Sequence, residues 1–296
     1  MKLLLQRSLW IACLLVLASG CVQAEPPQPL LWKISDADNH LYLLGSFHAL
    51  KPSDYPLAPS VDAAFADAEI VAFEMPPAEL NSPELPRKML AAARLPAGQQ
   101  LQRLLSPELW QQLEAYCNRW KLPVQQFQVL EPWFVALLIG VDSLTRNGYD
   151  PQLGLDRNLM ARAASAGKPT LGLETGDDQV RLFDGMSPRE QVDTLTDSLQ
   201  EAAGGKELDR LHSQWRAGDD RGLYEGMAGD FRKLYPMLYQ RIDSERNQAW
   251  LPKLRAMLDG EHQRDTLVVV GSLHLLGDEG LVAKLRAAGY KVERVN

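Results

Sequence analysis

The 296-residue sequence has little cysteine: only Cys13, Cys21 and Cys117 are present. Two of these lie in an N-terminal segment with the character of an export signal, so only Cys117 would remain in the folded part. An intrachain disulfide is then impossible, although many small exported domains depend on disulfides. The fold must be held by packing, and 46% hydrophobic residues over this length are enough for a sizeable core.

The sequence also lacks a hydrophobic run long enough to cross a membrane. The apolar run Leu9–Ala18 is far shorter than the roughly 20 residues that a transmembrane helix needs. Basic residues Lys2 and Arg7 precede this run and small residues follow it. This order is typical of an export signal, and it predicts that residues 1–24 are removed from the mature protein.

Two ways of processing this signal remain open. Ordinary signal peptidase would cleave after Ala24, whereas Ala18-Ser19-Gly20-Cys21 resembles a lipobox that would leave Cys21 lipid-modified. Either route predicts a periplasmic or cell-envelope protein, with membrane attachment only through a lipid on Cys21. Residues 25–30 are expected to be a proline-rich linker, and residues 31–296 a single domain.

Positive charge is scarce, and several familiar catalytic motifs are missing. The net charge of −7 becomes −9 when residues 1–24 are removed with their two positive charges, which argues against nucleic acid as a partner. The sequence contains no Gly-x-Ser-x-Gly, no phosphate-binding glycine-rich lysine motif, no Cys-x-x-Cys and no His-Glu-x-x-His. Any metal site must therefore be assembled by the tertiary fold.

What the sequence does contain is a set of short apolar runs that end in reactive residues. Two of them, Leu41–Leu44 and Thr266–Val270, are followed by the same Gly-Ser-x-His motif. Such runs predict buried strands, and the residues that follow four of them are His48, Glu74, Glu174 and His274. Because ligands bind beyond the carboxyl ends of parallel strands, we expect these four side chains to meet.

Helical patterns separate these strands. Helices are expected over residues 59–68, through much of 78–146, and over 156–166, 187 onward, 208–216, 237–258 and 278–288, while 31–34 and 40–44 should form a hairpin. Ser106-Pro107 and Ser187-Pro188 have the capping serine and first-turn proline of helix starts. The expected fold is α/β, with a central largely parallel sheet, surrounding helices and a large helical insertion.

Imidazole and carboxylate groups at strand ends suit a divalent metal ion such as Zn²⁺, Mn²⁺ or Co²⁺. Two histidines and one carboxylate would leave a position open for chemistry on a carbonyl group, and the second glutamate would be available as a general base. The remaining histidines, His40, His212 and His262, lie in polar or helical surroundings and are predicted to be surface residues.

At these residues the sequence resembles the TraB/GumN family, which includes the TIKI metalloproteases. The matching segments are 42–48, 73–74, 148–151, 154–156, 172–175, 245–247 and 271–274. The resemblance implies a fold similar to the erythromycin-esterase and haem-binding ChaN-like group. It also implies a metal-dependent hydrolytic site, adds Asp156 to the candidate ligands, and gives Arg246 a role in holding a substrate carboxylate or an oxyanion.

The sequence thus predicts an exported metal-dependent hydrolase that acts on a peptide or protein. Its catalytic candidates are Glu74, Glu174 and Arg246, and its metal-ligand candidates are His48, His274, Glu74, Glu174 and Asp156. Two alternatives remain at this stage. One is a non-catalytic protein that binds a peptide or haem in the same cleft, and the other is a lipid-anchored envelope protein with a vestigial site.

Overall fold

The structure, a computed structural model, describes residues 25–204, 206–260 and 264–295. The expected export signal, both processing sites and His262 lie outside the described residues. Residues 25–30, expected to be a linker, have no regular secondary structure but lie against the fold: Gln28 N–H donates to Arg216 O at 2.8 Å, and Gly45 N–H donates to Leu30 O at 2.8 Å. No helix in the described ranges is long and apolar enough to cross a membrane.

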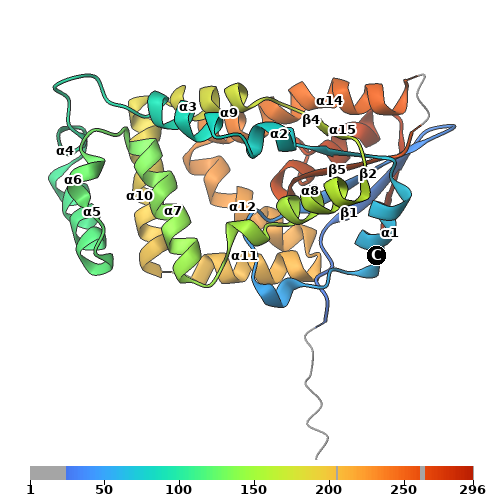
Figure 1. The fold of residues 1–296 in the computed structure, drawn as a ribbon, viewed down its shortest axis with the longest axis horizontal. Helices are drawn as coiled ribbons and strands as arrows, with labels where there is room; N and C mark the ends of the chain where they lie inside the picture. The colour runs from blue at the N-terminus through green and yellow to red at the C-terminus, as the bar shows by residue number, and fades with distance from the viewer. Residues whose placement is uncertain (1–24, 205, 261–263, 296) are drawn as a thin grey trace, which may run out of the picture.

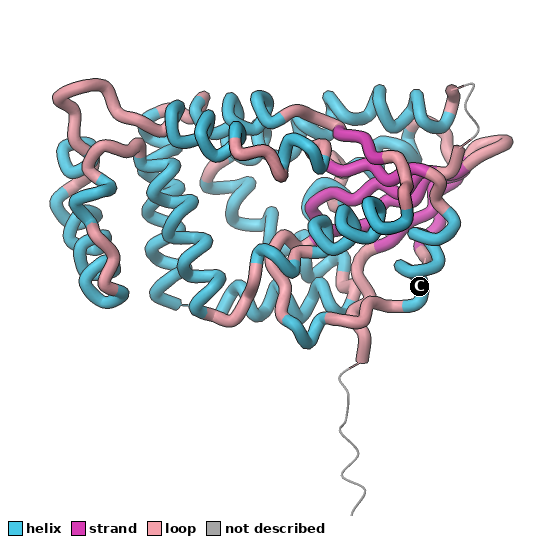
Figure 2. Tube along the Cα trace, in the orientation of Figure 1, coloured by secondary structure: helices cyan, strands magenta, loops and turns pink. Residues whose placement is uncertain are grey.

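A six-stranded sheet lies towards one end of the described chain, at the right of Figures 1 and 2, with the strand order β4-β3-β5-β2-β1-β6. The strands are β1 (Leu31–Ser35), β2 (His40–Ser46), β3 (Ile70–Phe73), β4 (Thr170–Gly172), β5 (Thr266–Gly271) and β6 (Lys291–Arg294). The neighbours β4, β3, β5 and β2 pair in parallel, whereas β1 is antiparallel to both β2 and β6. The expected hairpin and the expected largely parallel α/β sheet are confirmed.

Helices cover both faces of this sheet, which explains why β2, β3 and β5 are almost continuously apolar and buried. Helix α1 (Pro59–Asp67) follows β2, α8 (Leu155–Ala166) precedes β4, and α14 (Glu245–Leu258) precedes β5. Right-handed crossovers place α1 and α8 on one face and α14 on the other, where α15 (Leu281–Ala287) packs beside it (Figure 1).

A helical region extends from the sheet and has a core of its own, centred on buried side chains such as Trp110, Leu113, Trp133 and Leu195. Its first part comprises α2 (Pro77–Leu80), α3 (Glu84–Ala92), α4 (Leu101–Leu104), α5 (Pro107–Trp120), α6 (Val124–Phe127) and α7 (Pro132–Arg146). Its second part comprises α9 (Gly176–Asp184), α10 (Pro188–Gly204) and α13 (Pro236–Tyr239). Between α10 and α13, α11 (Lys206–Ala217) and α12 (Asp220–Leu234) return to the sheet, where Trp215 and Leu223 belong to its core. Figure 1 shows α5 and α6 farthest from the sheet, with α7 and α10 between.

The expected helix starts are confirmed, and one expectation about burial is wrong. Ser106 caps α5 by accepting a hydrogen bond from Leu109 N–H at 3.2 Å, and Ser187 forms a capping box with Glu190. His212 was expected at the surface, but it is only 7% exposed, because α11 packs it against Trp215 and its Nε2 lies 2.8 Å from the fully buried carboxylate of Asp54.

Candidate functional site

The carboxyl ends of β2, β3, β4 and β5 bring the predicted residues to one edge of the sheet. His48 follows β2, Glu74 follows β3 and Glu174 follows β4, while His274 lies in a single 3₁₀ turn (Ser272–Leu275) after β5. Both histidines face the same carboxylate: His48 Nε2 and His274 Nε2 each lie 3.9 Å from Glu74 Oε1. Residues 226 positions apart in the chain therefore share one oxygen atom as neighbour.

Arg246, on the first turn of α14, joins the two glutamates. Its Nη2 donates to Glu74 Oε2 at 2.5 Å and to Glu174 Oε1 at 2.7 Å, and its Nε donates to Glu174 Oε2 at 3.0 Å. Its Nη1 lies 2.9 Å from Nε2 of His274. Although burial favours the neutral acid, the Arg246 guanidinium holds the pKa of Glu74 well below its usual range. Glu74 is therefore ionised at neutral pH.

Oxygen atoms behind His274 fix its orientation. Its Nδ1 lies 2.8 Å from Asn247 Oδ1 and 3.2 Å from Asp243 Oδ1. Because both neighbours accept hydrogen bonds, Nδ1 carries the proton and Nε2 presents its lone pair towards Arg246 and Glu74. Asp243 is fully buried and lies on a π-helical turn (Gln240–Ser244) that leads into α14, a feature that is frequent at functional sites.

His48 is oriented in the same manner from the other side. Its Nδ1 lies 3.3 Å from Asp156 Oδ1, and Ser46 Oγ donates to the same oxygen at 3.1 Å. Desolvation by the surrounding protein atoms opposes protonation here, but the carboxylates of Asp156 and Glu74 raise the pKa of His48 to about 9, so the ring carries a positive charge at neutral pH. The His48 side chain is 63% exposed, in contrast to 6% for His274. The protein thus encloses His274, whereas His48 is open to solvent.

Glycine in the second Gly-Ser-x-His motif keeps the space between these donors open. A Cβ atom on Gly271 would lie 3.3 Å from Glu74 Oε1, 3.4 Å from His48 Nε2 and 3.6 Å from His274 Cδ2. The φ of Gly271 is −52°, which any residue adopts, so the backbone conformation does not require glycine. Its N–H donates to Glu74 Oε1 at 2.7 Å. Glycine is needed here for space.

The sequence profile of the TraB/PrgY/gumN family matches residues 30–294. The chain belongs to this family. It is 25% identical over 250 residues to "Uncharacterized protein YbaP" of Escherichia coli (strain K12), covering 84% of this chain and 89% of that protein, and equally similar to its Shigella flexneri namesake. It is 24% identical to "Metalloprotease TIKI1" of Danio rerio, over 93% of this chain and 65% of that protein. No solved structure matches the chain, so similarity to the ChaN-like group stays a prediction.

The side chains at the site of this TraB/PrgY/gumN protein are of the kinds that bind a divalent ion: a carboxylate oxygen of Glu74, Nε2 of His48 and the ring edge of His274 border the space beside Gly271. In the structure, however, their donor atoms do not lie close enough together to bind one ion. Within the described ranges, only His40, Asp67 and Asp265 place three donor atoms within 4.8 Å of one another. An ion at Gly271 would require His48 to turn inward and Arg246 to release Nε2 of His274.

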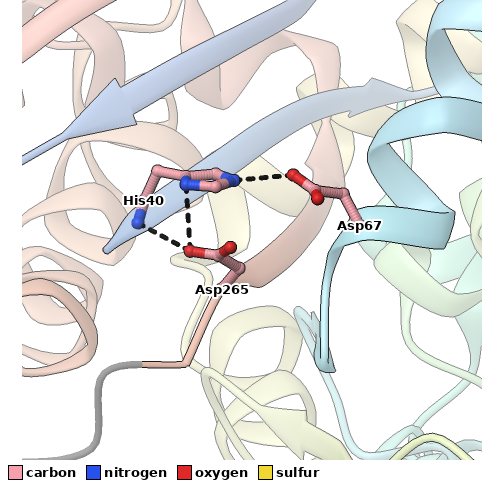
Figure 3. Close-up of side chains that lie close together, drawn as sticks. All are labelled: His40, Asp67 and Asp265. Carbon is pink, nitrogen blue, oxygen red and sulfur yellow. Dashed lines mark hydrogen bonds and ion pairs between the residues drawn. The ribbon is translucent and has the colours of Figure 1, made fainter. Parts of the chain in front are cut away.

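The cluster of His40, Asp67 and Asp265 differs from this site in its place in the sheet and in its contacts (Figure 3). It lies at the amino ends of β2 and β5, the edge opposite His48 and His274. Nε2 of His40 contacts Asp67 Oδ2 at 2.8 Å, and Nδ1 contacts Asp265 Oδ1 at 2.9 Å. Because a carboxylate lies within hydrogen-bond distance of each ring nitrogen, these three side chains satisfy one another without an ion. The cluster ties α1 to two strands, and the His40 side chain, predicted at the surface, is only 17% exposed.

Two polar residues of the site were not singled out as candidates from the sequence: Asp243 and Asn247. A signal for them existed, because Arg246 and Asn247 follow Asp243 by three and four positions, the spacing at which helical side chains are neighbours. In the structure, two of the predicted metal ligands already contact other side chains of the site. Asp156 lies behind His48 at Nδ1, and Glu174 is engaged by Arg246 through both oxygens.

Proposed function

We propose that this protein is an exported metal-dependent hydrolase that cleaves amide bonds in peptides. The observation that supports this most directly is the matched pair of histidines. Each has its Nδ1 held by an oxygen acceptor, and each directs Nε2 to the same oxygen of Glu74, 3.9 Å away. Metal-binding histidines in proteins have this second-shell arrangement. The relationship to a protein named a metalloprotease supports the same class of chemistry.

Each side chain has a distinct role in this proposal. His48, His274 and Glu74 would hold the ion, which supplies Lewis acidity to polarise a carbonyl group and makes water a nucleophile near neutral pH. Binding of the ion would displace the proton on Nε2 of His48, and Asp156 would keep the remaining proton on Nδ1. In the reaction, the oxygen of water bonds to the carbonyl carbon, the C–N bond breaks, and the leaving nitrogen takes up a proton.

Arg246 supplies the positive charge for the oxyanion that forms on the substrate carbonyl. Its bidentate pairing with Glu174, at 2.7 and 3.0 Å, fixes the plane of the guanidinium, while Nη1 is held only by a histidine nitrogen and by Ile242 O at 3.2 Å. Once Nη1 has released Nε2 of His274, this guanidinium, still held in plane by Glu174, is free to donate to the oxyanion. Glu174 therefore acts on the reaction through Arg246.

Peptide cleavage tests the proposal. The purified protein, loaded in turn with Mn²⁺, Co²⁺ and Zn²⁺, is incubated with a peptide library, and the products are identified by mass spectrometry. We expect cleavage that a chelator abolishes, that His48→Ala abolishes, and that His40→Gln leaves intact because His40 lies at the opposite edge of the sheet. Tight binding of peptides without products would instead favour a binding protein with the same cleft.

A further inference from the structure

A cavity of about 280 Å³ lies beside His48 and Glu74. Much of its wall is apolar, formed by Phe73, Met75, Leu80 and Met160. Its volume is at the small end of the range for ligand sites, so it suits one residue of a substrate rather than a long segment. Methionine adapts its shape to different apolar groups, which favours a large apolar side chain as the occupant.

Two carboxylates of the same cavity, Glu74 and Asp156, are engaged by Arg246 and His48, whereas the cation in its lining has no acidic partner among the described residues. Arg157, on the first turn of α8, lines the cavity, and its guanidinium makes one long contact to Asn81 Oδ1 at 3.5 Å. None of the ion pairs in the described part of the chain includes it. Arg162 on the same helix, in contrast, pairs with Asp62 at 2.9 Å. In a protein with a net negative charge, a guanidinium left unpaired beside an apolar cavity suits a carboxylate ligand.

We propose that this cavity binds the carboxyl-terminal residue of the substrate, with its free carboxylate on Arg157 and its apolar side chain against Met75, Leu80 and Met160. This inference rests on the proposed function and names its substrate class: amides of an apolar amino acid whose carboxylate is free. Hydrolysis adds water to the carbonyl carbon that precedes this residue, breaks the C–N bond and releases the amino acid, whose nitrogen takes up the proton.

Matched substrates test the role of Arg157. Two peptides end in leucine and differ only in a free carboxylate or a carboxamide. For the metal-loaded wild type we expect kcat/KM at least tenfold higher for the carboxylate. Arg157→Gln should bring the two rates within about twofold of each other by slowing only the carboxylate peptide. The control Arg162→Gln, on the same helix, should keep the wild-type ratio.

A second substrate pair tests the apolar wall and the source of the acyl group. Met160→Ala should reduce the preference for a terminal leucine over a terminal glycine several-fold. The rate of cleavage of N-dodecanoyl-leucine is then compared with that of a leucine-terminated peptide. Because both compounds present the same carboxylate and side chain, the faster reaction shows whether the acyl group is a fatty acid or a peptide.

Binding to the metal-free protein separates this inference from the proposed hydrolase. N-Acetyl-leucine should bind more tightly than N-acetyl-leucinamide by calorimetry, and Arg157→Gln should remove the difference. Cleavage of both peptides at equal rates, or no difference in binding, would overturn the inference and leave the hydrolase standing. Preferential carboxylate binding without cleavage of any amide would overturn the hydrolase and retain the pocket.

Discussion

Gly271→Ala adds one methyl group to the space between the three donors. Because φ is −52°, the backbone tolerates alanine, and the loss of glycine freedom in the unfolded chain offsets about 0.4–1 kcal/mol of any contact strain. The new Cβ atom lies 3.3 Å from Glu74 Oε1 and 3.4 Å from His48 Nε2, so these neighbours must move by a few tenths of an ångström. We expect the free energy of unfolding to change by no more than about 1 kcal/mol.

The same methyl group should have a large effect on metal affinity. It occupies the space that the donors enclose, so the loss should be at least the roughly 10- to 100-fold that second-shell substitutions cause. Affinity is measured by competition with a chromophoric chelator, beside thermal unfolding. Gly140→Ala in α7 is the control, because no atom lies within 4 Å of its Cβ position. Unchanged affinity in Gly271→Ala would refute the placement of the ion.

Three further outcomes follow from the contacts of the site and the core. Asp243→Asn should loosen the Nδ1–H tautomer of His274, seen in ¹⁵N NMR of the imidazole, and lower metal affinity by about 10- to 100-fold; an unchanged tautomer would contradict this role. Glu174→Gln should lower kcat by about 10²-fold with metal content retained, because Arg246 loses its bidentate partner; loss of the metal would instead make Glu174 a ligand. Although burial opposes ionisation, hydrogen bonds from His212, Arg216 and the backbone hold the pKa of Asp54 below its ordinary value of 3.8. The stabilisation by ionised Asp54 is therefore present above about pH 4 and lost as the pH falls further, so the difference in unfolding free energy between wild type and Asp54→Asn should shrink over that window.

The positions of the main site residues could be predicted because local pattern and sheet topology determine them together. An apolar run that ends in Gly-Ser-x-His predicts a strand end, and parallel neighbours bring such ends to one edge. The carboxyl ends of β2 and β5 therefore place His48 and His274 on the same side of Glu74.

The roles of those residues could not be predicted in the same way, because they depend on contacts between distant segments. Arg246 reaches Glu74 across 172 positions, and this contact decides how Glu174 is engaged. The burial of His212 depends on a carboxylate 158 positions away, in a short turn without any periodic signal. The π-helical turn that directs Asp243 at His274 is likewise invisible to a helical pattern with a period of 3.6 residues.

The most direct test of the account is metal analysis of the purified protein, with His274→Ala and His40→Gln beside the wild type. Each protein is loaded with Mn²⁺, Co²⁺ or Zn²⁺, desalted and analysed for bound metal. The account predicts near-stoichiometric metal in the wild type and in His40→Gln, and its loss in His274→Ala. Equal metal in all three proteins, or loss in His40→Gln alone, would contradict it.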